Sequence, residues 1–295
     1  MISINDAFKK FKHRLELTEG EQKDASRRQN DIREYLREEF EIERDFLTGS
    51  YARWTKTKPL KDVDIFFVLG MKEAGYRKQK PDVILGKFRA KLARKYGDDR
   101  VALGRRSVQV DFGVEAVDDT SGDQVMSVDA VPAFESAGHF EIPDREAGEW
   151  VSTDPEVHAD RATKANQAFA EEWKPLVKMI KKWNQVVSKP LKPSFLIEVM
   201  ALELFVPPFR GGYPYELKGF FATAADRVGD TWHDPANLGP AVSDQMDTTR
   251  VREAIAAFRR AEEMASRAIR LARDGNEGEA LREWRKLFGP LFPLS

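Results

Sequence analysis

The segment from Phe46 to Leu69 constrains the fold most strongly, because it places two acids at the start of an apolar strand. It reads FLTGSYARWTKTKPLKDVDIFFVL. Its last eight residues, DVDIFFVL, combine β-branched and aromatic side chains and predict a buried strand. Because side chains alternate along a strand, Asp62 and Asp64 lie on one face, about 6.5–7 Å apart. The segment therefore predicts a sheet that carries paired carboxylates.

These two carboxylates suggest a metal site. Like charges this close repel each other unless something compensates them, and Mg²⁺ favours a few carboxylates together with substrate phosphates. Gly49 and Ser50 predict a sharp turn and a helix start, whose backbone N–H groups could hold a phosphate. Metal ions beside a phosphate site indicate phosphoryl or nucleotidyl transfer. The alternative for an isolated DxD motif is a turn residue followed by a solvated strand end.

The motifs GSY-x-R-x-T and PL-x-DVDI resemble the signature of DNA polymerase β-like nucleotidyltransferases. More narrowly, they resemble the CD-NTases, the bacterial relatives of cyclic GMP–AMP synthase and oligoadenylate synthase. The family pattern includes a third acid on a neighbouring strand, and the run SVDAVPAF supplies it as Asp129. Asp111, in VQVDFG, competes for this role; strand alternation leaves the two nearly equal, and the family match favours Asp129. The resemblance implies that Asp62, Asp64 and Asp129 are catalytic and hold Mg²⁺, with Mn²⁺ as an alternative ion.

The same resemblance implies residues that bind the nucleotide. Gly49 and Ser50 would hold phosphates. LVKMIKKW is similar to the family's LLKxW helix and places Lys181 at the triphosphate, with Lys178 as the alternative one turn earlier. A solvated helix lysine explains Lys181 equally well.

Two further residues are implied by position or motif. Ser194, before FLIE, resembles the family serine that reaches phosphate, and a plain helix N-cap explains it just as well. Asn166 lies where an Asn is associated with uracil selection, since an amide offers donors and an acceptor to a base edge. An ordinary polar helix position is the alternative for Asn166.

The expected fold is α+β and bilobed. A polymerase β-like lobe with a mixed sheet would cover residues 1–154, and a helical, oligoadenylate-synthase-like lobe would cover 155–295. Apolar periodicity and turn residues predict the following elements: helices at 3–18, 21–40, 81–96, 156–187 (broken near Pro175), 195–206, 216–227, 244–274 and 277–287; strands at 62–69, 101–103, 105–112 and 125–131; and loops at 71–80 and 139–154.

Composition narrows the class of protein. The chain has no cysteine, which excludes disulfides and the thiolate zinc module of the animal enzymes. Its formal net charge of −1 argues against an obligatory nucleic-acid partner. The start lacks the apolar core of a secretory signal, and the most apolar stretch is too interrupted to span a bilayer. We therefore expect a cytoplasmic protein.

The resemblance implies a synthase that condenses nucleoside triphosphates, ATP and UTP, into a cyclic dinucleotide for anti-phage (CBASS) signalling. A uridine-containing product such as cyclic UMP–AMP is expected because of Asn166. The alternatives are a transferase that modifies a drug, a protein or a tRNA end, and a duplex-sensing oligonucleotide synthase. A regulatory protein partner of unknown identity would fit the family.

Overall fold

The structure, a computed structural model, describes residues 2–113 and 127–295. Contacts between Cα atoms divide the chain into two compact units. One unit comprises residues 17–159, and the other comprises residues 1–16 together with 160–295. The sequence-based division at 154/155 differs from this because the first helix groups with the C-terminal helices. Each unit is described by itself.

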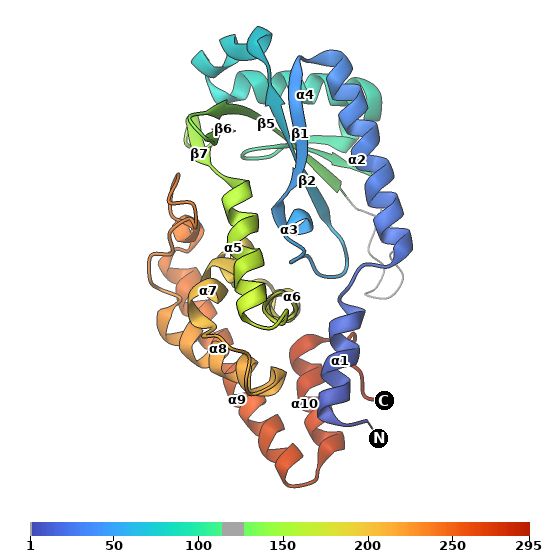
Figure 1. Cartoon of the computed structure of the whole chain (residues 1–295), viewed down its shortest axis with the longest axis vertical. Helices are drawn as coiled ribbons and strands as arrows, with labels where there is room; N and C mark the ends of the chain where they lie inside the picture. Colours follow the sequence, from blue (N-terminus) through green and yellow to red (C-terminus); the bar gives the residue numbers. More distant parts are fainter. Residues whose placement is uncertain (1, 114–126) are drawn as a thin grey trace. The chain divides into compact units, whose positions relative to one another are not determined.

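The unit of residues 17–159 is built on a mixed seven-stranded sheet (Figure 1). Its main path runs β1-β2-β5-β4-β3, and β6 and β7 continue from the far half of β5. The pair β2–β5 is parallel, and the other pairs are antiparallel. The strands are β1 (Ile42–Thr48), β2 (Asp62–Leu69), β3 (Val101–Leu103), β4 (Val108–Asp111), β5 (Ser127–Ser136), β6 (His139–Asp144) and β7 (Glu149–Thr153).

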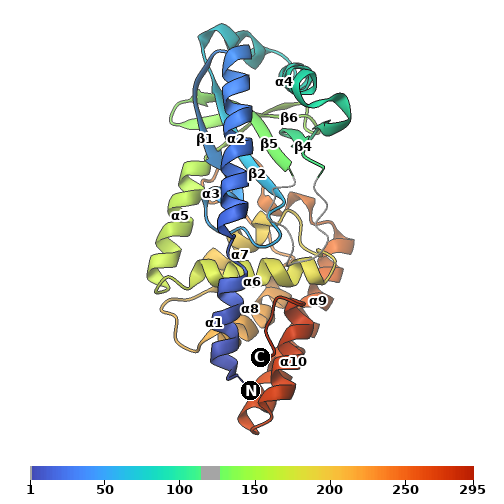
Figure 2. The same ribbon diagram turned by 90° about the vertical axis from the view of Figure 1, so that its right-hand side faces the viewer.

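Two helices, α2 (Glu19–Glu39) and α4 (Pro81–Tyr96), cover one face of this sheet (Figures 1 and 2). A capping box between Thr18 and Glu21 starts α2, and Pro81 occupies the first turn of α4. The helices bury the apolar face of the central strands, and burying each large side chain contributes about 1.5–3 kcal/mol. The shared core includes Ile32, Leu36, Val63, Ile65, Phe67, Ile84, Phe88, Val108, Val110, Val128 and Ala130.

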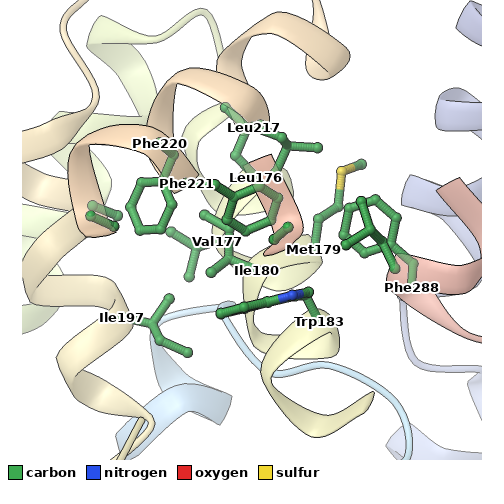
Figure 3. Close-up of a cluster of buried hydrophobic side chains, with 14 of the residues drawn as sticks. Leu176, Val177, Met179, Ile180, Trp183, Ile197, Leu217, Phe220, Phe221 and Phe288 are labelled. Atoms are coloured by element: carbon green, nitrogen blue, oxygen red, sulfur yellow. The ribbon is translucent and has the colours of Figure 1, made fainter. Parts of the chain in front are cut away.

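The other unit is helical and packs around aromatic side chains. Trp183 of α6 (Trp173–Val186) stacks on Phe258 at 4.9 Å and contacts Phe221 at 5.1 Å between ring centroids. Figure 3 shows Trp183 beneath the apolar side chains of the same helix. Phe8 of α1 (Ile4–Arg14) packs against Phe292, which ties the N-terminal helix to the C-terminus. The remaining helices are α7 (Phe195–Leu204), α8 (Tyr213–Arg227), α9 (Thr248–Arg273) and α10 (Glu277–Phe288), while α5 (Pro155–Ala168) crosses the boundary at 159/160.

The α+β class with a mixed sheet is confirmed, and the structure corrects several details. The expected loop at 139–154 is wrong, because β6 and β7 form a hairpin whose turn contains Gly148. Strand β1 is absent from the elements that the sequence predicts. The long helix breaks at residues 169–172, where Ala170 and Glu171 adopt positive φ, and Pro175 lies inside the first turn of α6. Residues 71–78 form a 3₁₀ helix in the expected loop.

Two other findings bear on the expectations from sequence. The first two residues of the expected strand 125–131 lie outside the described residues, and β5 extends to Ser136. None of the described helices is both long and apolar enough to cross a lipid bilayer.

Candidate active site

The register of β2 and β5 brings the predicted acids together. Asp64 lies directly opposite Asp129 in the parallel pair, and Asp62 lies opposite Ser127. Neighbouring strands are about 4.8 Å apart, and paired residues share a face of the sheet. The three carboxylates therefore belong to one patch, with Asp64 and Asp129 as immediate neighbours.

Burial along the strands shows which face this is. Val63, Ile65, Val128 and Ala130 are buried in the core under α2 and α4. Because side chains alternate, the acids between them emerge on the opposite face, where Asp62 is exposed and Asp64 and Asp129 are half-buried. The apolar pattern that folds the strand thus also determines the direction of the carboxylates.

The turn after β1 holds the carboxylate of Asp64. Gly49 begins the four-residue helix α3 (Gly49–Ala52) with φ of +65°, a conformation that favours glycine. A Cβ at this position would overlap Oδ2 of Asp64 and lie 2.7 Å from its Cγ. The backbone of the turn and the carboxylate are therefore in close contact, and only glycine allows it.

Ser50 follows within the same turn. Its carbonyl oxygen accepts hydrogen bonds from the N–H groups of Thr55 and Lys56, at 3.0 and 3.1 Å. These bonds fold the basic segment after α3 back onto the turn. The predicted phosphate loop is thus a defined structural element beside Asp64.

Asp129 is held by a residue that the sequence did not indicate. The Ser107 hydroxyl donates to Oδ1 of Asp129 at 2.9 Å. Burial raises the pKa of Asp129 to about 6; the negative charge of Asp62 also raises it, whereas hydrogen bonds from Ser107 and Gln109 lower it. Because side chains alternate along a strand, the sequence indicates that Ser107 and Gln109 lie on the face opposite Val108. It does not reveal the register that pairs Gln109 with Asp129.

An ionic cluster fixes the turn that carries Ser107. Asp144 is fully buried and accepts hydrogen bonds from Nε of Arg105 and Nε of Arg106, all at 2.9 Å. Burial alone would raise the pKa of Asp144, but bonds from Arg105, the Ala147 N–H and Arg106 lower it to about 2. Because both arginines directly precede Ser107, this cluster positions the hydroxyl that holds Asp129.

The raised pKa of Asp129 predicts a cost in stability. A folded-state pKa of about 6, above the ordinary 3.8, means that the native state binds this proton more tightly than the unfolded state. The contribution of this proton to the free energy of unfolding is fully present below pH 4 and is lost as the pH rises through 6. We expect Asp129→Asn to raise the free energy of unfolding in metal-free buffer at pH 8 by up to about 3 kcal/mol.

Chemical denaturation of both proteins at pH 8, 6 and 4 measures this difference. The gain should shrink as the pH falls through 6 and be smallest at pH 4, because the native state then keeps the proton and the unfolded state is close to its ordinary pKa of 3.8. Added Mg²⁺ should stabilise only the wild type. A variant that is less stable than wild type at pH 8 would contradict the conclusion that burial raises the pKa of Asp129.

The competing acid, Asp111, lies elsewhere on the sheet. Asp111 lies on β4 and pairs with Ser127 of β5. Its side chain is exposed and accepts a hydrogen bond from the Gly113 N–H at 2.8 Å. Two inter-strand steps separate its strand from β2, about 9.5 Å. Asp129, not Asp111, is the direct neighbour of Asp64.

The patch has suitable donors for a hard cation such as Mg²⁺, namely carboxylate oxygens whose mutual repulsion a cation would relieve. Within residues 2–113 and 127–295, however, no three acidic or imidazole side chains converge as a preformed metal cluster. Asp64 is turned against Gly49, and Asp129 is bonded to Ser107. The residues fit the ion, and binding would require the side chains to turn toward one another.

In the helical unit, the predicted triphosphate lysine forms a buried ion pair. Nζ of Lys181 lies 2.7 Å from Oε1 of Glu198 on α7, and both side chains are buried. Lys178, the alternative, pairs with Glu16 at 2.6 Å. A phosphate would have to compete with a carboxylate at either lysine.

The other two predicted residues of this unit differ in availability. Asn166 is buried; its Oδ1 accepts from the Lys174 N–H at 2.9 Å and its amide nitrogen donates to Glu171. It therefore links the end of α5 to the start of α6. Ser194 stands at the N-cap position of α7, is exposed, and makes no side-chain cap hydrogen bond. Its hydroxyl remains available to a ligand.

Comparison with known proteins decides the family. Residues 2–166 match the model of the SMODS domain, described as Second Messenger Oligonucleotide or Dinucleotide Synthetase. The chain belongs to this family. Like other SMODS proteins of the CD-NTase group, it is a nucleotidyltransferase of the class that builds cyclic nucleotides.

Similar proteins span nearly the whole SMODS chain. A probable cyclic nucleotide synthase of Bacillus cereus is 28% identical over 83% of this chain and 81% of its own. A cyclic AMP-AMP-AMP synthase of Acinetobacter is 27% identical over 92% of this chain and 80% of its own. The structure of CdnC from Escherichia coli MS115-1 with ATP, at 20% identity, covers 99% of both chains with a TM-score of 0.70.

Proposed function

We propose that this SMODS protein condenses ATP into a cyclic oligoadenylate and releases pyrophosphate. The observation that carries the chemistry is the register that sets Asp64 beside Asp129, with Asp62 on the same face. The relatives named cyclic AMP-AMP-AMP synthases support the choice of adenine. A role in anti-phage signalling is consistent with this chemistry.

The residues of the patch have distinct roles in this mechanism. Asp62, Asp64 and Asp129 would hold Mg²⁺, which neutralises charge on the triphosphate when it is bound. Asp129 accepts the proton of the attacking ribose hydroxyl, because it lies directly beside Asp64 and because burial makes its carboxylate more basic than an ordinary aspartate in the metal-free protein. The hydroxyl oxygen forms the new bond to the α-phosphorus as the bond to pyrophosphate breaks.

The Gly49–Ser50 turn binds phosphate oxygens of the donor. Its backbone lies against Asp64, so a phosphate held there is adjacent to the acids. Ring closure repeats the same transfer within the linear product. No second substrate is required, which distinguishes this reaction from the modification of a drug, protein or tRNA end.

The expected uridine preference depends on Asn166. Because both ends of its side-chain amide are engaged with Glu171 and the Lys174 N–H, its geometry gives no support to base reading. A cyclic UMP–AMP product therefore has weaker support than a product made from ATP alone.

Mass spectrometry of products from all four nucleoside triphosphates with Mg²⁺ tests the proposal. We expect phosphatase-resistant cyclic oligoadenylate together with pyrophosphate, and no requirement for added nucleic acid. A product that contains uridine would restore the role predicted for Asn166. Activity that appears only with added duplex, and that falls steeply with salt, would instead support the duplex-sensing alternative.

A further inference from the structure

The helical unit contains a cavity that the proposed chemistry does not use. Its volume is about 350 Å³, and its wall includes the apolar residues Ile4, Pro214, Ala268, Ile269 and Ala272. A second hollow of about 240 Å³ shares Tyr215, Ile269 and Arg273 with it, so the two adjoin. All of these residues lie in the unit of residues 1–16 and 160–295. The combined volume is that of a small-ligand site.

Two aromatic rings, those of Tyr215 and Trp284, line the cavity. Trp284 of α10 is fully buried, lies edge-on to Phe8 at 5.0 Å and stacks on Phe288 at 6.0 Å between ring centroids. Within the described part of the chain its indole N–H has no hydrogen-bond partner. This nitrogen has almost no accessible surface, so a ligand in the cavity would contact the indole ring and not its N–H.

The hollow that adjoins the cavity is lined by basic side chains. Lys218, Arg270 and Arg273 line the adjoining hollow. No carboxylate of the described residues lies within salt-bridge distance of either arginine, and the nearest to Lys218 is Glu262 at 3.9 Å. Arg273 instead lies over the Tyr215 ring at 5.8 Å and donates to its hydroxyl at 3.4 Å.

The neighbouring arginine on the same helix shows the contrast. Arg267 pairs with Glu283 at 3.2 Å, which compensates its charge. Arg270 and Arg273 lie in the last turn of α9, where cations interact favourably with the helix dipole, but this leaves most of their charge available to a ligand. An anionic group in the adjoining hollow would bind both guanidinium groups.

We propose that this cavity binds a small planar aromatic anion. The ring would occupy the apolar cavity against the rings of Tyr215 and Trp284, and a carboxylate or phosphate would bind Arg270 and Arg273. The apolar and aromatic lining accounts for the ring, and the two arginines without a carboxylate partner account for the anionic group. The proposal is independent of the nucleotide chemistry.

Titration calorimetry with matched probes tests each part. We expect 2-naphthoate and 1-naphthyl phosphate to bind with 1:1 stoichiometry, and neutral naphthalene-2-methanol to bind at least about tenfold more weakly. The tighter of the carboxylate and the phosphate identifies the source of the natural head group.

Variants connect binding to the cavity. Arg270→Gln combined with Arg273→Gln should weaken both anions at least about tenfold, and Ala272→Phe should remove binding by filling the cavity. Arg260→Gln, an exposed arginine of α9 outside the cavity, is the matched control and should change nothing. Thermal unfolding checks that each variant folds.

Three results would overturn the proposal: no saturable binding at millimolar probe, equal affinity for the neutral analogue, or binding that persists in a folded Ala272→Phe protein. Product formation from ATP should be unchanged in all of these variants, because none of the residues belongs to the patch of Asp62, Asp64 and Asp129. The binding proposal can therefore fail while the proposed enzymatic function stands.

Discussion

Asp64→Asn is expected to lower the rate of product formation from ATP by at least roughly 10³-fold. The carboxylate lies between Asp129 on the neighbouring strand and the Gly49 turn, so it is adjacent to both the proposed base and the proposed phosphate site. Losing its charge removes a metal ligand, and metal ligation supplies several kcal/mol of transition-state stabilisation, about a factor of ten for each 1.4 kcal/mol. Asp62→Asn and Asp129→Asn should have effects of similar size.

Asp111→Asn is the matched control for this experiment. It removes an acid from the same sheet, but one that is exposed and bonded to the Gly113 N–H. We expect this variant to retain activity within about twofold, a change of less than about 0.5 kcal/mol in the barrier. Loss of activity with Asp111→Asn and normal turnover with Asp129→Asn would assign the third acid to Asp111 and contradict the role proposed for Asp129.

Gly49→Ala is expected to reduce activity by at least about 10²-fold while the protein stays folded. The new methyl group would occupy the position of the Asp64 carboxylate, which must rotate away. The backbone strain at φ of +65° adds about 1–2 kcal/mol of destabilisation. A displacement of about 1 Å at a reacting group is enough to cost about two orders of magnitude in rate.

Gly148→Ala separates strain from displacement. Gly148 has a similar φ of +72°, but a Cβ there would meet nothing within 4 Å. Both variants should lose stability in thermal unfolding through backbone strain, Gly49→Ala the more because of its contact with Asp64, and only Gly49→Ala should lose activity. Equal activity of the two variants would show that the contact between Gly49 and Asp64 is unimportant for catalysis.

Part of this fold could be predicted because local signals agreed with tertiary packing. The strand Asp62–Leu69 and the helix Pro81–Tyr96 have the predicted bounds. In the strand, an uninterrupted apolar run follows two acids, and in the helix Pro81 and Gly97 mark the ends. Both elements lie against the same core, so pattern and packing require the same residues.

Other elements depend on pairing that a single sequence does not contain. The hairpin β6–β7 includes Pro143, a residue that usually argues against a strand. Strand β1 has a mixed burial pattern and exists because it pairs with β2. Periodicity predicts the N-terminal helix, but it does not reveal the partners of that helix, Phe288 and Phe292, at the other end of the chain.

The candidate site shows the same division. Strand alternation predicts that Asp62 and Asp64 share one face, and the inter-strand register then sets Asp129 beside Asp64. The roles of Lys181 and Asn166 rest on motif and position, and the structure shows Lys181 paired with Glu198 and Asn166 linking two helices. Ser107 could not be predicted from the sequence, because nothing in a serine before a short strand indicates that it will bond to Asp129.

The most direct test is the structure of the protein crystallised with Mn²⁺ and a non-hydrolysable ATP analogue, in which anomalous scattering locates the ions. We predict manganese bound by the carboxylates of Asp62, Asp64 and Asp129, with phosphates of the analogue beside the Gly49–Ser50 turn. Manganese bound by other residues would contradict the proposed metal site. So would a structure in which the analogue is bound but none of these three carboxylates contacts an ion.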